Sequence, residues 1–133
     1  MSSIIKELWI FSKEGIPIIE ITDDTKLDKY LMGSFISAIK TYSQHLSEKG
    51  GLNCFIMENC KFTVKSALYG NSILVCKTES DIKEKKITKI CNVIVRIFEE
   101  LYDVDDLKNW NGDLAFFDKF KEKIELYFKM SNL

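Results

Sequence analysis

Few side chains in this sequence have the types and spacing that catalysis needs. His45 is the only histidine, so histidine metal triads and a Ser-His-Asp arrangement are excluded. We interpret it as an exposed residue of a helix. The sequence also lacks the glycine-rich phosphate loop that ends in Gly-Lys-Ser/Thr, so the chain is not itself a P-loop GTPase. These residues therefore predict no reactive centre.

The remaining reactive groups are thiols, at Cys54, Cys60, Cys76 and Cys91. No two have the C-x-x-C spacing of a zinc or redox site. Each lies among apolar residues, which predicts small buried side chains. Cys54 and Cys60 could approach each other across a hairpin, but we interpret them as reduced.

Charged residues gather in two places. Four lysines, with Glu84 among them, are expected at the start of one helix: Lys83, Lys85, Lys86 and Lys89. The simplest interpretation is a solvated helix face, and the alternative is a contact with anionic lipid or an acidic partner. Without an apolar residue to insert, such a cluster predicts weak peripheral membrane contact at most. The far end of the same helix carries acidic side chains, which we interpret as solvated or facing a basic partner: Glu99, Glu100, Asp103, Asp105 and Asp106.

Composition bounds the class of protein. The 133 residues fit a single domain, 1–133, with 46% hydrophobic and 29% charged residues. A net charge of -1 predicts no binding to nucleic acid. No segment reads as a signal peptide or as a membrane span of about eighteen apolar residues, so a cytoplasmic protein is the default expectation.

Hydrophobic periodicity predicts the elements in order. Residues 4–22 read as two strands joined by a turn, and the first is apolar on both sides, as expected of a central strand. Pro17 predicts a sheet edge for the second. Residues 27–49 show helical spacing, with a buried stripe of Leu27, Leu31, Phe35, Ala38, Tyr42 and Leu46 and a shoulder of Met32, Ile36 and Ile39.

Three strands follow, at 52–57, 61–68 and 72–78, and hairpins between them predict a mostly antiparallel sheet. The second strand alternates, so that Ser66 is expected to face inward and Thr63 outward, and Gly70 and Asn71 suit the turn after it.

A capping box, Asp81 with Glu84, predicts a helix that continues to about Tyr102. Its expected buried stripe is Ile87, Ile90, Cys91, Ile94, Phe98 and Leu101. An acidic connection then leads to a last helix capped by Asp113, whose expected buried stripe is Leu114, Phe117, Phe120, Ile124 and Phe128. We expect Trp110 to pack this connection onto the core.

This order, ββαβββαα, resembles the longin domain of the longin/roadblock superfamily. The residues that carry the likeness are 7–11 (Glu-Leu-Trp-Ile-Phe), 15–17 (Gly-Ile-Pro), the helix around 31–38 and the strand 73–75. The opening is similar to that of stand-alone archaeal longin-like proteins. The resemblance covers almost the whole chain, and it implies an α+β fold with a five-stranded sheet in the order 2-1-5-4-3, one helix on one face and two on the other.

The resemblance also implies a role without catalysis or cofactor. Longin domains act as platforms in membrane traffic, many of them as dimers, and several bind small Ras-like GTPases. Our first hypothesis is therefore a scaffold that binds such a GTPase or another longin or roadblock subunit, as a homo- or heterodimer. The second is a sensor or enzyme that holds a small molecule in the sheet–helix crevice.

Candidate partner-binding residues lie on three surfaces. On the first helix, core packing is the simplest interpretation of the shoulder of Met32, Ile36 and Ile39. The alternative is that the shoulder stays exposed for a partner, beside the small residues Gly33 and Ser37, which permit close approach of another helix. The open edges of the outer strands contribute Ile18 and Phe55. The lysine-rich helix start contributes Lys83 and Lys86.

Overall fold

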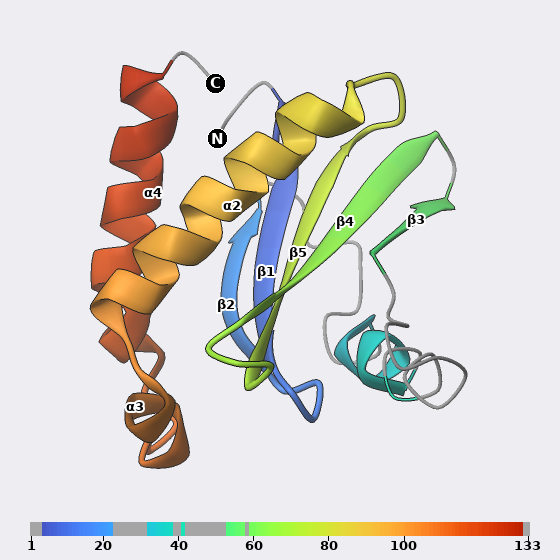
Figure 1. The fold of residues 1–133 in the computed structure, drawn as a ribbon. Coiled ribbons are helices and arrows are strands. Elements are labelled where there is room, and N and C mark those ends of the chain that lie inside the picture. Colours follow the sequence, from blue (N-terminus) through green and yellow to red (C-terminus); the bar gives the residue numbers. More distant parts are fainter. Residues whose placement is uncertain (1–3, 23–31, 39–40, 42–52, 58, 132–133) are drawn as a thin grey trace.

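In the computed structural model, an antiparallel sheet lies between helices on its two faces (Figure 1). The structure describes residues 4–22, 32–38, 41, 53–57 and 59–131. The sheet has five strands in the order β2-β1-β5-β4-β3. This confirms the predicted fold class and strand order. His45 and Ile39 lie outside the described residues, as does most of the helix predicted over 27–49.

Strand β1, Glu7–Ser12, is an interior strand of the sheet because both of its edges are paired. It is antiparallel to β2, Pro17–Thr22, on one side and to β5, Ser72–Glu79, on the other. Trp9 lies opposite Val75, as the predicted pairing requires. Side chains on both faces of β1 are buried. The two-sided apolar pattern therefore did identify a central strand.

Strands β3, Cys54–Met57, and β4, Cys60–Ala67, complete the sheet. The sequence predicted that Ser66 of β4 faces inward and Thr63 outward, and both predictions are wrong: Ser66 is exposed and Thr63 is buried. The reason is that helices cover both faces of this sheet. An alternating pattern then separates two buried layers instead of separating core from solvent.

Helix α2, Glu84–Leu101, packs on one face with the buried stripe Ile87, Ile90, Cys91, Ile94 and Phe98, as predicted. Its start differs from the prediction. The N-cap is Lys83, which makes no side-chain cap hydrogen bond, so the expected capping box of Asp81 and Glu84 does not form. The capping box that does form lies at α3, Val104–Lys108, where Asp103 and Asp106 each accept a hydrogen bond from the other's backbone N–H.

A short 3-10 helix, η1 (Leu114–Phe117), precedes α4 (Asp118–Met130). Asp113 caps η1 by accepting a hydrogen bond from the N–H of Ala115. The predicted buried stripe is confirmed from Phe117 to Phe128, but Leu114 is exposed because the chain turns through η1 before α4 begins. Trp110 packs edge-on against Phe117 at 5.3 Å, as expected.

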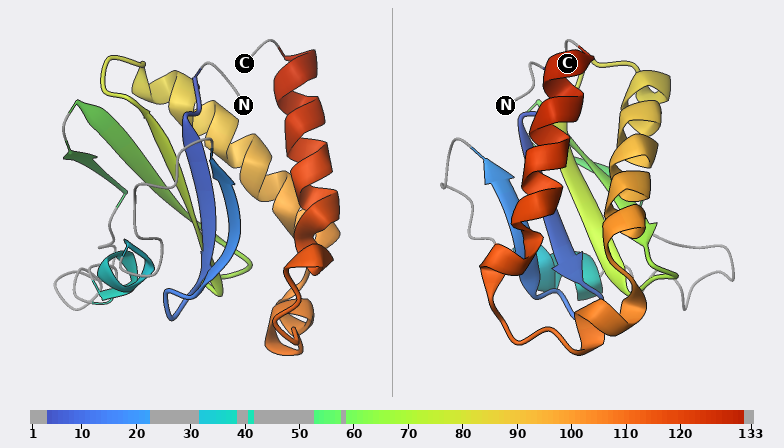
Figure 2. Two further views of the ribbon diagram at one scale, coloured as in Figure 1. Left: turned by 180° about the vertical axis from the view of Figure 1, so that it is seen from behind. Right: turned by 90° about the vertical axis from the view of Figure 1, so that its left-hand side faces the viewer.

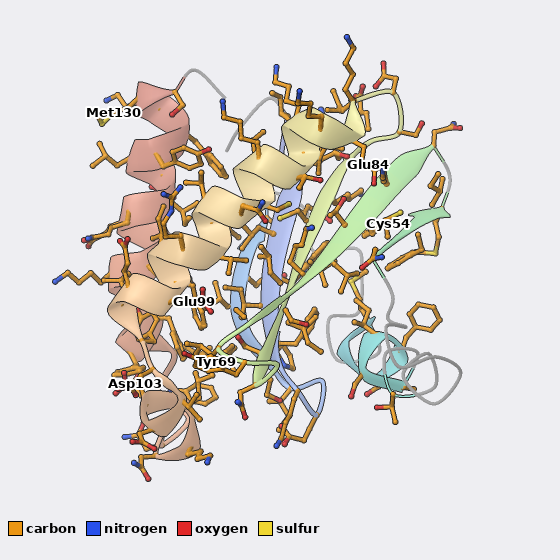
Figure 3. All side chains as sticks on the ribbon, in the orientation of Figure 1. Cys54, Tyr69, Glu84, Glu99, Asp103 and Met130 are labelled. Atoms are coloured by element: carbon orange, nitrogen blue, oxygen red, sulfur yellow. The ribbon has the colours of Figure 1, made fainter. Side chains whose placement is uncertain are left out.

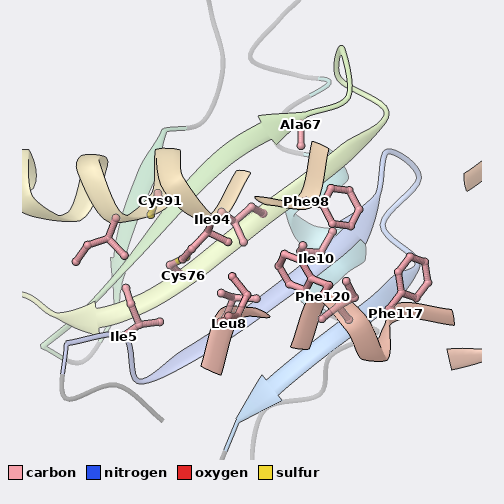
Figure 4. Close-up of a cluster of buried hydrophobic side chains, with 14 of the residues drawn as sticks. Ile5, Leu8, Ile10, Ala67, Cys76, Cys91, Ile94, Phe98, Phe117 and Phe120 are labelled. Atoms are coloured by element: carbon pink, nitrogen blue, oxygen red, sulfur yellow. The ribbon is translucent and has the colours of Figure 1, made fainter. Parts of the chain in front are cut away.

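Two separate cores result, one on each face of the sheet (Figure 2). The larger lies beneath α2 and α4, where Phe98 contacts Phe120 edge-on at 5.5 Å (Figure 4). The smaller lies beneath the helix at residues 32–38 and contains Trp9, Phe11, Met32, Ile36, Phe62, Val64, Ile73 and Val75. This confirms the predicted division of helices between the faces.

Candidate interaction surfaces

The helix at residues 32–38 lies tightly against the turn between β1 and β2. A Cβ at Gly33 would overlap the carbonyl oxygen of Gly15 and lie 2.8 Å from a ring carbon of Phe11. One turn later, the Ser37 hydroxyl donates a hydrogen bond of 2.8 Å to the carbonyl oxygen of Lys13. A close backbone approach at Gly33 was predicted and exists. However, the small pair Gly33 and Ser37 receives this chain's own hairpin, not a partner helix.

The same contact decides which side of the helix is buried. Met32 is 7% exposed and Ile36 is fully buried, so these two shoulder residues pack in the smaller core. This is the simpler of the two interpretations, and the alternative of an exposed shoulder is wrong for both residues. Phe35, which was expected in the buried stripe, is 48% exposed. The helix is thus rotated relative to the prediction, because Gly33 must face Gly15.

An exposed apolar surface lies beside this helix. The ring of Phe35 meets the edge of Phe55 at 5.7 Å, and Phe55 stacks on Phe62 at 4.8 Å. Ile56 and Met57, on the same strand, are strongly exposed. We call Phe35, Phe55, Ile56 and Met57 the β3 patch. Ile56 points to the opposite face of the sheet from Phe55 and Met57, so the patch surrounds the strand. Because β3 is an outer strand, the patch borders a hydrogen-bonding edge that faces away from the sheet.

The opposite outer strand does not offer a comparable surface. Ile10 pairs with Ile19 and Phe11 with Pro17, so Ile18 is the extra residue of a β-bulge. Its side chain is 5% exposed and belongs to the larger core. The Ile18 side chain is therefore not available to a partner, and the prediction that this strand binds a partner along its edge stays a prediction. A bulge beside a proline also disfavours pairing with another strand at this edge.

The lysines at the start of α2 lie where they were expected. Lys83, Lys85, Lys86 and Lys89 are all exposed. The end of α4 lies at the same end of the molecule, as the labels Glu84 and Met130 show in Figure 3. On α4, Leu126 and Met130 are 55% and 75% exposed. The buried stripe predicted for this helix gave no indication of the exposed pair, because the two residues lie on the other face.

The acidic residues lie at the opposite end of the molecule, around two shallow grooves. One, of about 620 Å³, is lined by Leu68, Tyr69, Glu99, Tyr102, Asp103, Val104 and Asp105. The other, of about 300 Å³, lies between α3 and Trp110. Several of these carboxylates already have structural roles. Asp103 and Asp106 cap α3, and Glu99 accepts a hydrogen bond of 2.9 Å from the N–H of Leu68.

The turn that Glu99 holds is strained. Leu68 and Tyr69 both have positive φ, 51° and 57°, a backbone conformation that residues other than glycine rarely adopt. Leu68 is buried in the core, whereas Tyr69 is 98% exposed. The hydrogen bond to Glu99 thus fixes a turn that displays an aromatic ring to solvent. The sequence identified Gly70 and Asn71 as turn residues but gave no sign of strain at Tyr69.

Two buried polar side chains on the sheet differ in their partners. The buried Thr63 hydroxyl makes no hydrogen bond within the part of the chain that the structure describes. The Glu7 carboxylate, on β1, accepts a hydrogen bond of 2.8 Å from the Thr22 hydroxyl and lies 3.7 Å from the Lys77 ammonium. These partners come from the two neighbouring strands, so Glu7 links them across the sheet.

The cysteines divide into two kinds. Cys76 of β5 and Cys91 of α2 are buried. A hydrogen bond that the Cys76 thiol donates to Cys91, together with burial, raises the pKa of Cys76 well above its usual range. Cys76 is therefore a poor nucleophile. Cys54 is exposed, contrary to the prediction of burial, because it lies on the outer strand. It pairs with Thr63 and not with Cys60.

The described ranges contain no metal site and no membrane-spanning helix. In these ranges, no three His, Cys, Asp or Glu side chains converge as metal ligands. None of the helices in that part of the chain is long and apolar enough to cross a bilayer. The β3 patch is accordingly the strongest candidate for a functional surface. Its residues combine apolar exposure with a strand edge that pairs with no other strand of the described ranges, which is the geometry of sheet extension.

Comparison with known proteins identifies the fold. No protein-family model and no curated protein matches the sequence. Solved structures do match: MglB in a tetrameric arrangement has a TM-score of 0.55 at 10% identity, over 63% of this chain and 67% of that one. Myxococcus xanthus MglB has a TM-score of 0.54 at 13% identity, over 72% and 85%. The mammalian SRP receptor has a TM-score of 0.51 at 15% identity and covers 97% of this chain and 98% of its own. The chain therefore has the fold of the longin/roadblock superfamily.

Proposed function

We propose that this chain is a non-catalytic interaction module of the longin type. It binds a small Ras-like GTPase or another longin or roadblock subunit, and works in a complex that regulates or directs membrane traffic. The observation that carries the proposal is the β3 patch. Phe35, Ile56 and Met57 are 48%, 63% and 45% exposed, and they flank β3 from both faces of the sheet. Such exposed apolar side chains, beside a strand edge that pairs with no other described strand, are typical of a protein interface.

The patch favours pairing with a subunit of the same fold. A second β3 strand can add its backbone hydrogen bonds to the open edge, while Phe35 and Ile56 become buried against their counterparts. The shared edge joins two sheets into one. The pairing is isologous when the second subunit is another copy of this chain. MglB, which has a similar fold, was solved in a tetrameric arrangement, and this supports the proposal that such a fold pairs with another subunit.

The alternative, a small molecule held between sheet and helix, has less support. Among the described residues, the space between the sheet and the helix at 32–38 is occupied by Trp9, Phe11 and Ile36, each almost fully buried. A ligand there would have to displace core side chains.

The proposal is tested by changing the patch. Phe35→Asp and Ile56→Asp each place a charge in the predicted interface without touching the core. We expect sedimentation velocity to show that each weakens self-association, or association with a captured subunit, at least about tenfold. Tyr69→Asp is the matched control, because that ring is also exposed but lies on the β4–β5 turn.

The partner class is tested separately. The wild-type protein, used as bait in its own cell extract, should retain a Ras-like GTPase or a longin or roadblock protein identified by mass spectrometry, and the Ile56→Asp variant should lose it. A monomeric wild-type protein that retains neither class would contradict the proposal.

A further inference from the structure

Helix α2 carries its charges in the order that its own dipole disfavours. Exposed lysines surround its start, where the partial charge of the helix is positive, and Lys83 itself occupies the N-cap without a cap hydrogen bond. The last turn of the helix has no basic residue. Glu84 in the first turn offsets only part of this charge. A helix start that breaks local rules in this way is typical of a functional site.

The structure places exposed apolar side chains at the same end of the molecule as the lysine cluster, which the sequence alone did not show. The last turns of α4 lie at the same end of the molecule as Lys83 and Lys86, so that Met130 and Glu84 appear along one edge in Figure 3. Leu126 and Met130 are spaced four residues apart, which places them on one face of α4. That face is opposite to the buried stripe, so both apolar side chains are exposed to solvent and contribute nothing to the core.

We propose that this end of the molecule, formed by Lys83, Lys85, Lys86, Lys89, Leu126 and Met130, binds the surface of a membrane that contains anionic phospholipid. The ammonium groups meet the phosphate and carboxylate groups of the lipid head groups, and Leu126 and Met130 enter the interfacial layer. Asp81 and Glu84 reduce the positive charge but leave an excess of lysine. This inference goes beyond the proposed function, because the β3 patch takes no part in it.

A lipid surface fits better than an acidic peptide. Both grooves described above lie at the acidic end, around Asp103 and Tyr69. The basic end instead presents protruding flexible side chains, lysines and a methionine, which suit a deformable surface. Binding through few charges and two apolar side chains is expected to be weak, reversible and sensitive to salt.

Sedimentation with vesicles tests the proposal. The full chain should bind vesicles rich in phosphatidylserine, not vesicles of phosphatidylcholine alone, and should dissociate as salt is added. Two variants, Lys83→Glu with Lys86→Glu and Leu126→Ser with Met130→Ser, should each lose at least about tenfold in binding.

Matched controls lie at the other end of the molecule. Lys13→Glu with Lys108→Glu makes the same change in net charge, and Leu114→Ser removes a side chain that is 54% exposed, against 55% for Leu126. Both should bind like wild type. Glutamate is favoured at a helix start, so the charge-reversed variant should remain folded, which circular dichroism checks.

Absence of binding to phosphatidylserine vesicles would overturn the proposal, even if an acidic protein were captured by the lysines. Equal binding to phosphatidylcholine, or equal loss in the control variants, would overturn it as well. The basic-end variants should keep the oligomeric state of wild type, so failure here is distinguishable from failure of the β3 interface.

Discussion

At the scale of single residues, Gly33 has the largest effect on where the exposed surface lies. In an ordinary helix, Gly→Ala stabilises by about 1 kcal/mol. Here the added methyl group would overlap the backbone of Gly15. We therefore expect Gly33→Ala to lower the free energy of unfolding by about 2 kcal/mol or more, measured by urea denaturation. Ser34→Ala, at the next and exposed position, should change it by only a few tenths of a kcal/mol. A stabilised Gly33→Ala protein would show that the helix does not lie against the hairpin.

Tyr102 carries a pH dependence. Its hydroxyl donates a hydrogen bond of 3.1 Å to the carbonyl oxygen of Phe116, and burial raises the pKa of the phenol above its usual value. Because the folded pKa is the higher one, this contribution to stability is complete below about pH 10 and is lost as the pH rises through the raised value.

The corresponding variant is Tyr102→Phe. It should cost about 1 kcal/mol at neutral pH through the lost hydrogen bond. It should also make the alkaline loss of stability shallower than in wild type, as thermal unfolding at several pH values can show. The Tyr69→Phe control changes a fully exposed hydroxyl and should alter neither quantity. Parallel alkaline profiles for wild type and Tyr102→Phe would contradict the assignment.

At the scale of elements, the start of α2 is less stable than it could be. Lys83 has the extended backbone of an N-cap residue but no side chain that can accept a hydrogen bond. Lys83→Asp should raise the stability by about 1 kcal/mol, seen as a higher midpoint in urea. Lys86→Asp, which lacks the cap geometry, should gain only a few tenths from the helix dipole. Equal gains from both would mean that capping contributes nothing here.

The elements differ in how well the sequence predicted them. The buried stripe of α2 was correct because its apolar residues occupy one side only, so the pattern has one solution. The helix at 32–38 is apolar on adjacent sides, and Met32 and Phe35 compete for the core. The contact between Gly33 and Gly15 decides between them, and it joins residues that no local pattern relates. The same limit explains Leu114, whose exposure depends on a 3-10 turn between two helical segments.

At the scale of the whole molecule, periodicity alone predicted a mostly antiparallel sheet covered on both faces. The order of the strands came from the resemblance to longin domains, because hairpins fix which strands are neighbours only when they are consecutive. The pairing of β1 with β5 joins residues 9 and 75, and its register depends on the two cores together. The candidate surface was only partly predictable. The strand with Phe55 was correctly predicted to be an outer strand. The exposed side chain that contacts the Phe55 ring is Phe35, whereas Met32 and Ile36 are buried.

The two outer strands provide a test of the assembly as a whole. If β3 is the edge that pairs with a second subunit, its outward-facing amides should exchange hydrogen more slowly as protein concentration rises. The amides of β2, which carries Pro17 and the bulge at Ile18, should be indifferent to concentration. Hydrogen exchange followed by mass spectrometry on peptides that cover 53–57 and 16–22 measures both. The Ile56→Asp protein should exchange at β3 like dilute wild type at every concentration. Concentration-dependent protection at β2 alone would place the interface on the other side of the sheet, because an open strand edge gains protection only where a partner's backbone pairs with it.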